Sequence, residues 1–263
     1  MRQKMVMLYN QSAALGASPT RVRLRGVRTA LQSLFASDSR KIFCLGLNKT
    51  GTTSLHRYFQ SLGLVSVHQM DWANYTRLFE QKKSFYAAQC FSDGERPDFT
   101  FLDQNFPSSL FILNSRDERD WLRSRVKHLL RLNVEHDASS VLRDTRFGIQ
   151  AREYFADNRL ALINWVSDRR IYHHQVKAYF KGSSQLLEID VTSEDDWQMT
   201  LREFLEENEY VLGATSSATP GPLHENSRSD ADLDLQESVE EGFRLIDEIL
   251  HLLDDPNYLA ADD

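Results

Sequence analysis

The chain has 263 residues, of which 41% are hydrophobic and 26% charged, and its formal net charge at pH 7 is −7. This composition is typical of a globular protein with a sizeable core. The acidic balance argues against a general nucleic-acid binder, and no apolar run approaches the roughly 18 residues that a membrane-spanning helix needs. The two cysteines, Cys44 and Cys90, lack the number and spacing of a disulfide framework or a zinc site.

The first 40 residues are basic and contain a single acidic residue, Asp38. Such a segment is typical either of an organelle-targeting sequence or of an amphipathic arm that packs on a domain. We therefore treat residues 1–40 as a basic N-terminal arm and expect one α/β domain over residues 41–263. Because the cysteine content fits a reducing compartment, we expect a cytoplasmic protein, with organelle targeting by the arm as the alternative.

Residues 42–45 form a short apolar run that ends at Gly46, which predicts a buried parallel strand. A helix is predicted next, because apolar residues recur with the helical period until Gly63, a typical stop. Its apolar stripe consists of Leu55, Tyr58, Phe59 and Leu62. Residues 65–67 predict a second strand, so this segment is a strand–loop–helix–strand unit.

The same alternation continues along the rest of the chain. Further strands are predicted just before Asp93, at 110–113 and at 186–189, and further helices at 118–132, 165–179 and 197–205. Residues 213–232 are rich in Ser, Thr, Pro and Gly and predict a loop or lid, followed by a C-terminal helix at 234–254. Strands that alternate with helices predict a three-layer α/β fold, with a mainly parallel central sheet flanked by helices.

The loop after the first strand, GLNKTGTTS, departs from a Walker A nucleotide-binding loop in one respect. Gly46 and Gly51 have the Walker A spacing, but Thr52 stands where that motif has its lysine, and the lysine of this loop is Lys49. A loop between a buried strand and a helix start suits an anion, because backbone N–H groups and the helix dipole point toward it. The sequence therefore predicts a P-loop-like anion site with a displaced lysine.

The end of the strand at 110–113 separates two classes of ligand. A nucleoside triphosphatase needs a carboxylate near such a strand end to hold Mg²⁺, whereas this chain has Asn114, Ser115 and Arg116 there. An arginine at this point favours an anion that binds without a metal ion. A nucleotide kinase or triphosphatase therefore fits less well and stays an alternative, together with a non-catalytic binding module on the same fold.

Two segments together resemble the sulfotransferases of the bacterial or cytosolic type, which use 3′-phosphoadenosine 5′-phosphosulfate (PAPS) as donor. LGLNKTGTTSL is similar to the family's first signature and RDERDWLRS to its second, although Glu118 stands where many members have proline. The resemblance covers about residues 42–207. It implies that the 5′-phosphosulfate is held by Lys49, Thr50, Gly51, Thr52 and Thr53. It also implies that Arg116 and Ser124 hold the 3′-phosphate, which distinguishes PAPS from ATP.

The resemblance further implies a reaction, the metal-independent transfer of the sulfuryl group from PAPS to a hydroxyl or amine of an acceptor. Lys49 would stabilise the charge on the leaving phosphate, and a general base would take the acceptor's proton. Asp93 and His68 are both candidates for this base, since each lies at the end of a predicted strand, and the sequence leaves the choice open. We expect a small-molecule, carbohydrate or lipid acceptor; its identity and the oligomeric state do not follow from the sequence.

Overall fold

The computed structural model describes residues 40–68, 70–73, 88–135, 146–210, 212 and 236–255. The expected N-terminal arm, apart from Arg40, and the expected loop or lid at 213–232 lie outside these residues. The described residues form two compact units. We call residues 40–115 with 182–212 the sheet unit and residues 116–181 with 236–255 the helical unit, and describe each by itself.

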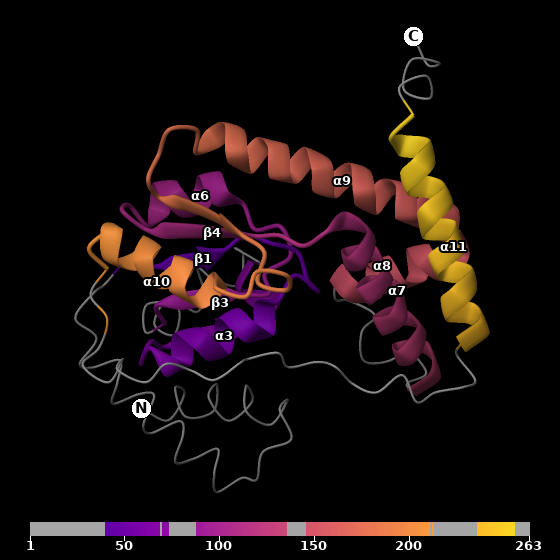
Figure 1. Ribbon diagram of the computed structural model, residues 1–263, viewed down its shortest axis with the longest axis horizontal. Helices are drawn as coiled ribbons and strands as arrows, with labels where there is room; N and C mark the ends of the chain where they lie inside the picture. Colours follow the sequence, from indigo (N-terminus) through magenta and orange to yellow (C-terminus); the bar gives the residue numbers. More distant parts are fainter. Residues whose placement is uncertain are drawn as a thin grey trace, which may run out of the picture. The chain divides into compact units, whose positions relative to one another are not determined.

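The sheet unit is built on five parallel strands in the order β2-β3-β1-β4-β5 (Figure 1). The strands are β1 (Ile42–Cys44), β2 (Ser66–His68), β3 (Cys90–Ser92), β4 (Leu110–Asn114) and β5 (Leu186–Ile189). Each of them coincides with a strand expected from the sequence, which confirms the predicted α/β class. The strand order reverses at β1, because β2 and β3 lie on one side of it and β4 and β5 on the other. Ligand sites of open α/β sheets lie beyond the carboxyl ends of the strands at such a point.

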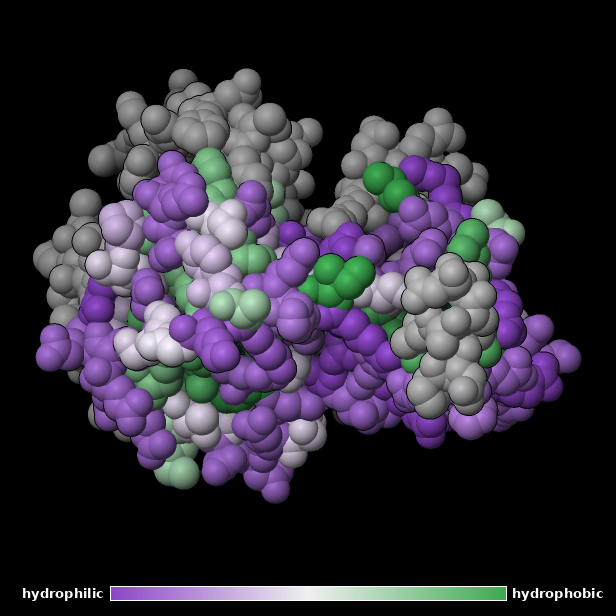
Figure 2. Space-filling view, turned by 90° about the horizontal axis from the view of Figure 1, so that it is seen from above, coloured by the Kyte–Doolittle hydropathy of each residue, from purple (hydrophilic) through white to green (hydrophobic). Residues whose placement is uncertain are grey.

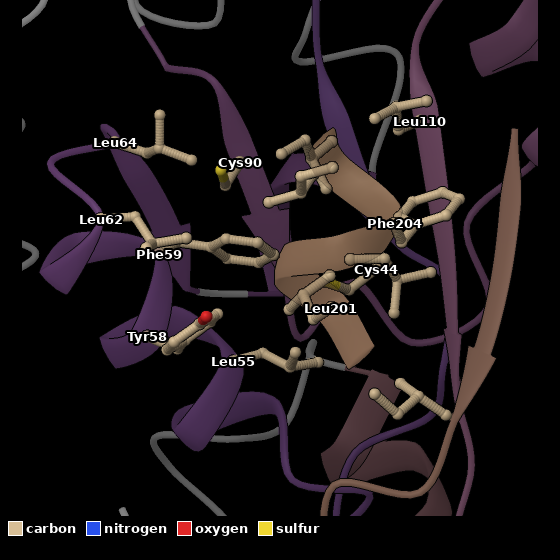
Figure 3. Packing of buried hydrophobic residues seen from close by; sticks show 14 of the residues in the cluster. Cys44, Leu55, Tyr58, Phe59, Leu62, Leu64, Cys90, Leu110, Leu201 and Phe204 are labelled. Atoms are coloured by element: carbon tan, nitrogen blue, oxygen red, sulfur yellow. The ribbon is translucent and has the colours of Figure 1, made fainter. Parts of the chain in front are cut away.

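One face of the sheet packs against helices α3 (Thr52–Ser61) and α10 (Trp197–Glu207). Figure 3 shows side chains of both helices gathered around the thiols of Cys44 and Cys90. The apolar stripe predicted for α3 is fully buried, and Gly63 follows its end with a φ of 79°, the left-handed conformation that stops a helix. The stripe that was expected on α10 is buried as well, which confirms both helices.

The opposite face of the sheet is aromatic. Phe43, Phe91 and Phe111 alternate with the residues of the first face, and their ring centroids lie 5.3–5.8 Å apart around Phe43. Trp72 from the short helix η1 (Met70–Ala73) stacks on Phe43 at 5.9 Å. Helix α6 (Phe99–Asn105), which the sequence did not predict, is followed by Phe106, whose ring also contacts that of Phe43. Because both faces are buried, β1 is a continuous apolar run rather than an alternating one.

The helical unit contains α7 (Glu118–Glu135), α8 (Arg146–Ala156), α9 (Asn158–Tyr179) and α11 (Gln236–Leu253). Helices α7, α9 and α11 agree with the sequence, whereas α8 was not predicted. In the sequence, Trp165, Tyr172, Val176 and Tyr179 form one apolar stripe of α9, but Tyr179, the last residue of that helix, is 43% exposed. Trp165, Tyr172 and Val176 of the same stripe are buried as expected.

The surface of the described residues is largely polar. Hydrophilic residues cover most of the face shown in Figure 2, and apolar residues form small separate patches there. The large apolar side chains that are exposed are Ile149, Phe155, Leu160, Ile171, Tyr179 and Met199. None of the described helices combines the length and the apolar character that crossing a membrane requires.

Candidate functional site

The loop that joins β1 to α3 is tightly folded at two positions. Lys49 has a φ of 67° and Gly51 a φ of 80°, so both adopt the left-handed conformation. Gly51 precedes α3 directly, and a Cβ added to it would lie 2.9 Å from Cβ of Val191, which follows β5. Glycine is therefore required there both by the conformation and by the space. The first turn of α3 contains no acidic residue, which leaves the helix dipole's positive potential unopposed within that turn.

Asn114, the last residue of β4, fixes this loop from the neighbouring strand. Its Oδ1 accepts a hydrogen bond from the backbone N–H of Gly46 at 3.0 Å. Its Nδ2 donates to Oγ1 of Thr50 at 2.6 Å and to the Thr50 carbonyl at 3.3 Å. The side chain is fully buried, so each of these bonds satisfies a group that water does not reach. The residue that replaces the Walker B carboxylate is thus a structural support of the loop.

A buried carboxylate supports the loop from β3. Glu95 is 1% exposed, and its Oε2 accepts a hydrogen bond from the backbone N–H of Asn48 at 2.7 Å. Glu95 and its neighbours Asp93 and Arg96 have φ values of 49°, 67° and 56°. Left-handed conformations in side-chain-bearing residues are uncommon and cluster at functional sites. The turn after β3 is therefore held in an unusual conformation next to the loop.

Asp93 lies in this turn and contacts the start of α3. Oγ1 of Thr52 donates a hydrogen bond to Oδ1 of Asp93 at 3.2 Å. Trp72 holds the turn on both sides of Asp93. Its indole N–H donates to the Ser92 carbonyl at 2.8 Å, and its ring lies so close to Gly94 that a Cβ there would come within 2.3 Å of it. Trp72 is buried, and its position explains why a glycine follows Asp93.

The surroundings of Asp93 change its acidity. Burial and, to a smaller extent, the negative charge of Glu95 raise the pKa of Asp93 from 3.8 to about 7. The hydrogen bond from Thr52 and the positive charge of Lys49 act in the opposite direction and are outweighed. A carboxyl group with this pKa exchanges its proton near neutral pH, which is the property required of a general base.

His68 is the last residue of β2 and also faces the start of α3. Its Nδ1 lies 3.0 Å from Oγ of Ser92, and its Nε2 lies 3.3 Å from Oγ1 of Thr53. Both ring nitrogens of His68 therefore have a side-chain hydroxyl within hydrogen-bond distance, and the Ser92 hydroxyl also reaches the Val67 carbonyl at 3.4 Å. Burial, followed by the positive charge of Arg57, lowers the pKa of His68 to about 4. The imidazole is therefore neutral at pH 7 and a weak base.

The second predicted motif lies in the helical unit. Arg116 lies two residues before α7, and Asp117, between them, caps this helix by accepting a hydrogen bond from the N–H of Asp120 at 3.0 Å. Ser124 lies two helical turns after Asp117, so the two share one side of α7. Arg116 and Ser124 are both half-buried. Their binding to the same ligand as the loop in the sheet unit stays a prediction.

The structure brings most of the predicted site residues together in the sheet unit. They are Lys49, Thr50, Gly51, Thr52, Thr53, His68 and Asp93. Sequence reasoning missed Asn114 and Glu95 as supports of the loop; a polar residue at the end of the apolar strand 110–113 was the available signal for the first. Within the described ranges, no three His, Cys, Asp or Glu side chains are grouped as metal ligands would be.

The sheet order and the loop at the end of β1 define an α/β protein with a P-loop-like fold. The family described as "Sulfotransferase domain" matches residues 41–209. Because this match covers more than half of the chain, the protein belongs to that family, and the resemblance seen in the sequence is confirmed. The reaction that follows from membership is sulfuryl transfer in general. The comparison with curated proteins found no match.

Proposed function

We propose that this protein transfers the sulfuryl group of PAPS to a hydroxyl or amine of an acceptor, without a metal ion. Family membership supports sulfuryl transfer, and the two motifs of the sequence support PAPS as the donor. The loop supports an anionic ligand, since Gly51 lets the backbone approach it closely and Lys49 brings a positive charge. The hydroxyls of Thr52 and Thr53 lie in the same segment, whereas the buried hydroxyl of Thr50 donates to the Leu47 carbonyl and accepts from Asn114, so it supports the loop itself.

The donor, when bound, supplies an activated sulfur whose leaving group is a phosphate. In the proposed reaction the acceptor oxygen or nitrogen forms a bond to sulfur, and the bond from sulfur to the oxygen of the 5′-phosphate breaks. The acceptor's proton passes to the base, which leaves a sulfated acceptor and adenosine 3′,5′-bisphosphate. Lys49 stabilises the charge that develops on the leaving phosphate, as preorganised cations do in phosphoryl transfer.

We assign the role of general base to Asp93 rather than His68. Two observations support this choice. The pKa of Asp93 is about 7, whereas that of His68 is about 4, and a base is most effective when its pKa lies near the working pH. Both ring nitrogens of His68 also already have a hydroxyl partner, Nδ1 in Ser92 and Nε2 in Thr53. In this proposal His68 orients Thr53 in the first turn of α3, and Asp93 takes the proton.

We assign the 3′-phosphate of the donor to Arg116 and Ser124. A guanidinium group binds phosphate through two parallel N–H donors, and a hydroxyl adds a third. Arg116 lies just before α7, where the helix dipole also favours an anion, and Ser124 lies two turns further along the helix. This assignment rests on the sequence motif and on the place of the two residues along the helix.

The observation that carries the proposal is the hydrogen bond between Thr52 and Asp93, because it joins the donor loop to the base. The test is thermal unfolding with nucleotides added. Adenosine 3′,5′-bisphosphate without Mg²⁺ should raise the melting temperature, and ATP with Mg²⁺ should not. Stabilisation by ATP with Mg²⁺ alone would instead identify a kinase or triphosphatase.

A second experiment separates an enzyme from a binding module. The protein is incubated with labelled PAPS and a metabolite extract, and sulfated products are detected by mass. We expect a labelled product with the natural sequence and none with Lys49→Ala. A product of equal yield from the Lys49→Ala variant would remove Lys49 from the mechanism. The same experiment identifies the acceptor, which we expect to be a small molecule, a carbohydrate or a lipid.

A further inference from the structure

A buried arginine of α9 contacts the start of α7 within the helical unit. Arg169 is 6% exposed, and its Nη2 donates a hydrogen bond to the backbone carbonyl of Arg116. Its Nη1 lies 3.4 Å from Oε1 of Glu118, on the far side of Asp117. The guanidinium group of Arg169 therefore contacts both Arg116 and Glu118, the two neighbours of Asp117, which caps α7.

The aromatic ring of Trp121 supports this arginine. The guanidinium carbon of Arg169 lies 5.0 Å from the centroid of the Trp121 ring, within the range of a cation–π contact. Trp121 is fully buried, and Arg125 makes a similar contact with it at 5.3 Å. Trp121 belongs to the second sequence motif, and its ring is buried against Arg169. The Trp121 ring therefore has a structural role, because its contact restricts the position of the Arg169 guanidinium group.

The two contacts of Arg169 restrict the backbone from which the Arg116 side chain leaves. A hydrogen bond to the Arg116 carbonyl fixes the orientation of that peptide group, and the ion pair with Glu118 fixes the first turn of the helix. Binding a phosphate through two parallel N–H groups requires an accurately placed guanidinium group. Lysine could not replace Arg169, since an ammonium group lacks the planar fork that reaches a carbonyl and a carboxylate together.

We propose that Arg169 is a positioning residue for recognition of the donor's 3′-phosphate, which acts by holding the backbone of Arg116 and the side chain of Glu118. This inference rests on the proposed function, because it takes Arg116 as the ligand of the 3′-phosphate. It also gives Glu118 a role. Glu118, which stands where many family members have proline, is one of the two groups that Arg169 contacts.

The adjacent residue Arg170 offers a matched control. It pairs with the same Glu118 at 2.6 Å and with Asp254 at 2.8 Å, and its side chain is 41% exposed. It thus shares the charge, the helix and one partner of Arg169. The contact to the Arg116 carbonyl belongs to Arg169. A difference between variants at these two positions therefore reports on that contact and on burial beside Trp121.

The test compares two ligands that differ in the 3′-phosphate. Adenosine 3′,5′-bisphosphate carries it, and adenosine 5′-phosphate, which is otherwise identical, does not. Their dissociation constants are measured by calorimetry, without Mg²⁺, for the natural protein, Arg169→Lys, Arg170→Lys and Arg116→Ala. We expect Arg169→Lys to weaken binding of the bisphosphate about tenfold or more, because a small misplacement of a binding group has large effects. Its affinity for adenosine 5′-phosphate, and both affinities of Arg170→Lys, should stay unchanged.

The outcomes are distinct. If Arg169→Lys weakens both ligands equally, or neither, Arg169 has no part in recognising the 3′-phosphate and the inference is wrong. If Arg116→Ala leaves bisphosphate binding unchanged, the proposed 3′-phosphate site itself is wrong. Should Arg169→Lys fail to fold, as judged by circular dichroism, Glu118→Gln takes its place. That variant weakens one of the two contacts, and we expect the same pattern with a smaller loss, about threefold.

Discussion

Thr52 and Asp93 are joined by a hydrogen bond of 3.2 Å between Oγ1 and Oδ1. Thr52 begins the helix that follows β1, and Asp93 follows β3, the strand that pairs with β1 in parallel. The bond therefore crosses from one strand end to the next, at the point where the strand order reverses. It places the carboxyl group with the raised pKa beside the loop that carries Lys49.

Replacement of Asp93 by asparagine should remove general-base catalysis. The amide keeps the shape of the side chain and can still accept the hydrogen bond from Thr52, but it cannot take a proton. We expect kcat/KM to fall by about 10²–10⁴-fold. In the natural protein kcat/KM should rise as the pH increases through about 7, because Asp93 must be ionised to act. The variant should lose this rise.

The control for this experiment is His68→Gln, which keeps a polar group near Thr53. It should reduce kcat/KM much less than Asp93→Asn and should retain the dependence on pH. The measurement uses PAPS and the acceptor identified from the metabolite extract. A profile in which His68→Gln abolishes the rise and Asp93→Asn preserves it would exchange the roles of the two residues.

The substitution Asp93→Asn should also alter how the stability of the protein depends on pH. The pKa of Asp93 is raised in the folded protein, so folding favours the protonated form. The folded state is then penalised progressively as the pH rises from about 4, the usual value, to about 7. Asparagine carries no charge and escapes this penalty. We therefore expect the melting temperature of Asp93→Asn, relative to the natural protein, to be higher at pH 8 than at pH 5. An equal difference at both pH values would contradict the burial of a charge at Asp93.

Gly51→Ala should destabilise the protein more than Gly182→Ala, a change at a glycine with the same backbone conformation. Gly51 and Gly182 have nearly the same φ, 80° and 79°. An alanine at either position meets the left-handed penalty of about 1–2 kcal/mol. At Gly182 the added methyl group meets nothing within 4 Å, whereas at Gly51 it meets Val191 at 2.9 Å.

The two glycine variants are compared by chemical unfolding and by binding of adenosine 3′,5′-bisphosphate. Gly182→Ala should lower the free energy of unfolding by the conformational penalty alone and leave binding intact. Gly51→Ala should lower it by about 1–3 kcal/mol more, the usual effect of overpacking, and should weaken binding. Equal losses at the two positions would mean that Val191 moves aside without resistance.

Asn114→Ala should destabilise the sheet unit and loosen the loop. The substitution leaves the N–H of Gly46 and the Thr50 carbonyl without their partner in a fully buried place. Such a loss lowers the free energy of unfolding by about 1–3 kcal/mol. The matched control is Asn105→Ala, since the Asn105 side chain is exposed and donates only within its own helix. That change should stay within about 0.5 kcal/mol. Equal effects in chemical unfolding would show that Asn114 is not a support of the loop.

Local patterns in the sequence determined most of the sheet and the donor loop. The apolar run before Gly46 predicted β1, and the helical period after Thr52 predicted α3, since periodicity and turn residues act within a few neighbours. Helix α8 was not predicted, and its apolar residues do not mark the face that it buries, since Ile149 and Phe155 are exposed whereas Gln150 is buried. The loop residues of the site were likewise predicted, because a displaced Lys49 beside Gly51 is a local feature.

The tertiary structure alone decided how that loop is supported and in which surroundings the two candidate bases lie. Asn114 and Glu95 reach the loop across strands that are distant in the sequence, and no local pattern specifies such a pairing. The choice between Asp93 and His68 depends on their surroundings. Burial raises the pKa of a carboxyl group and lowers that of an imidazole, because removal from water disfavours whichever form is charged.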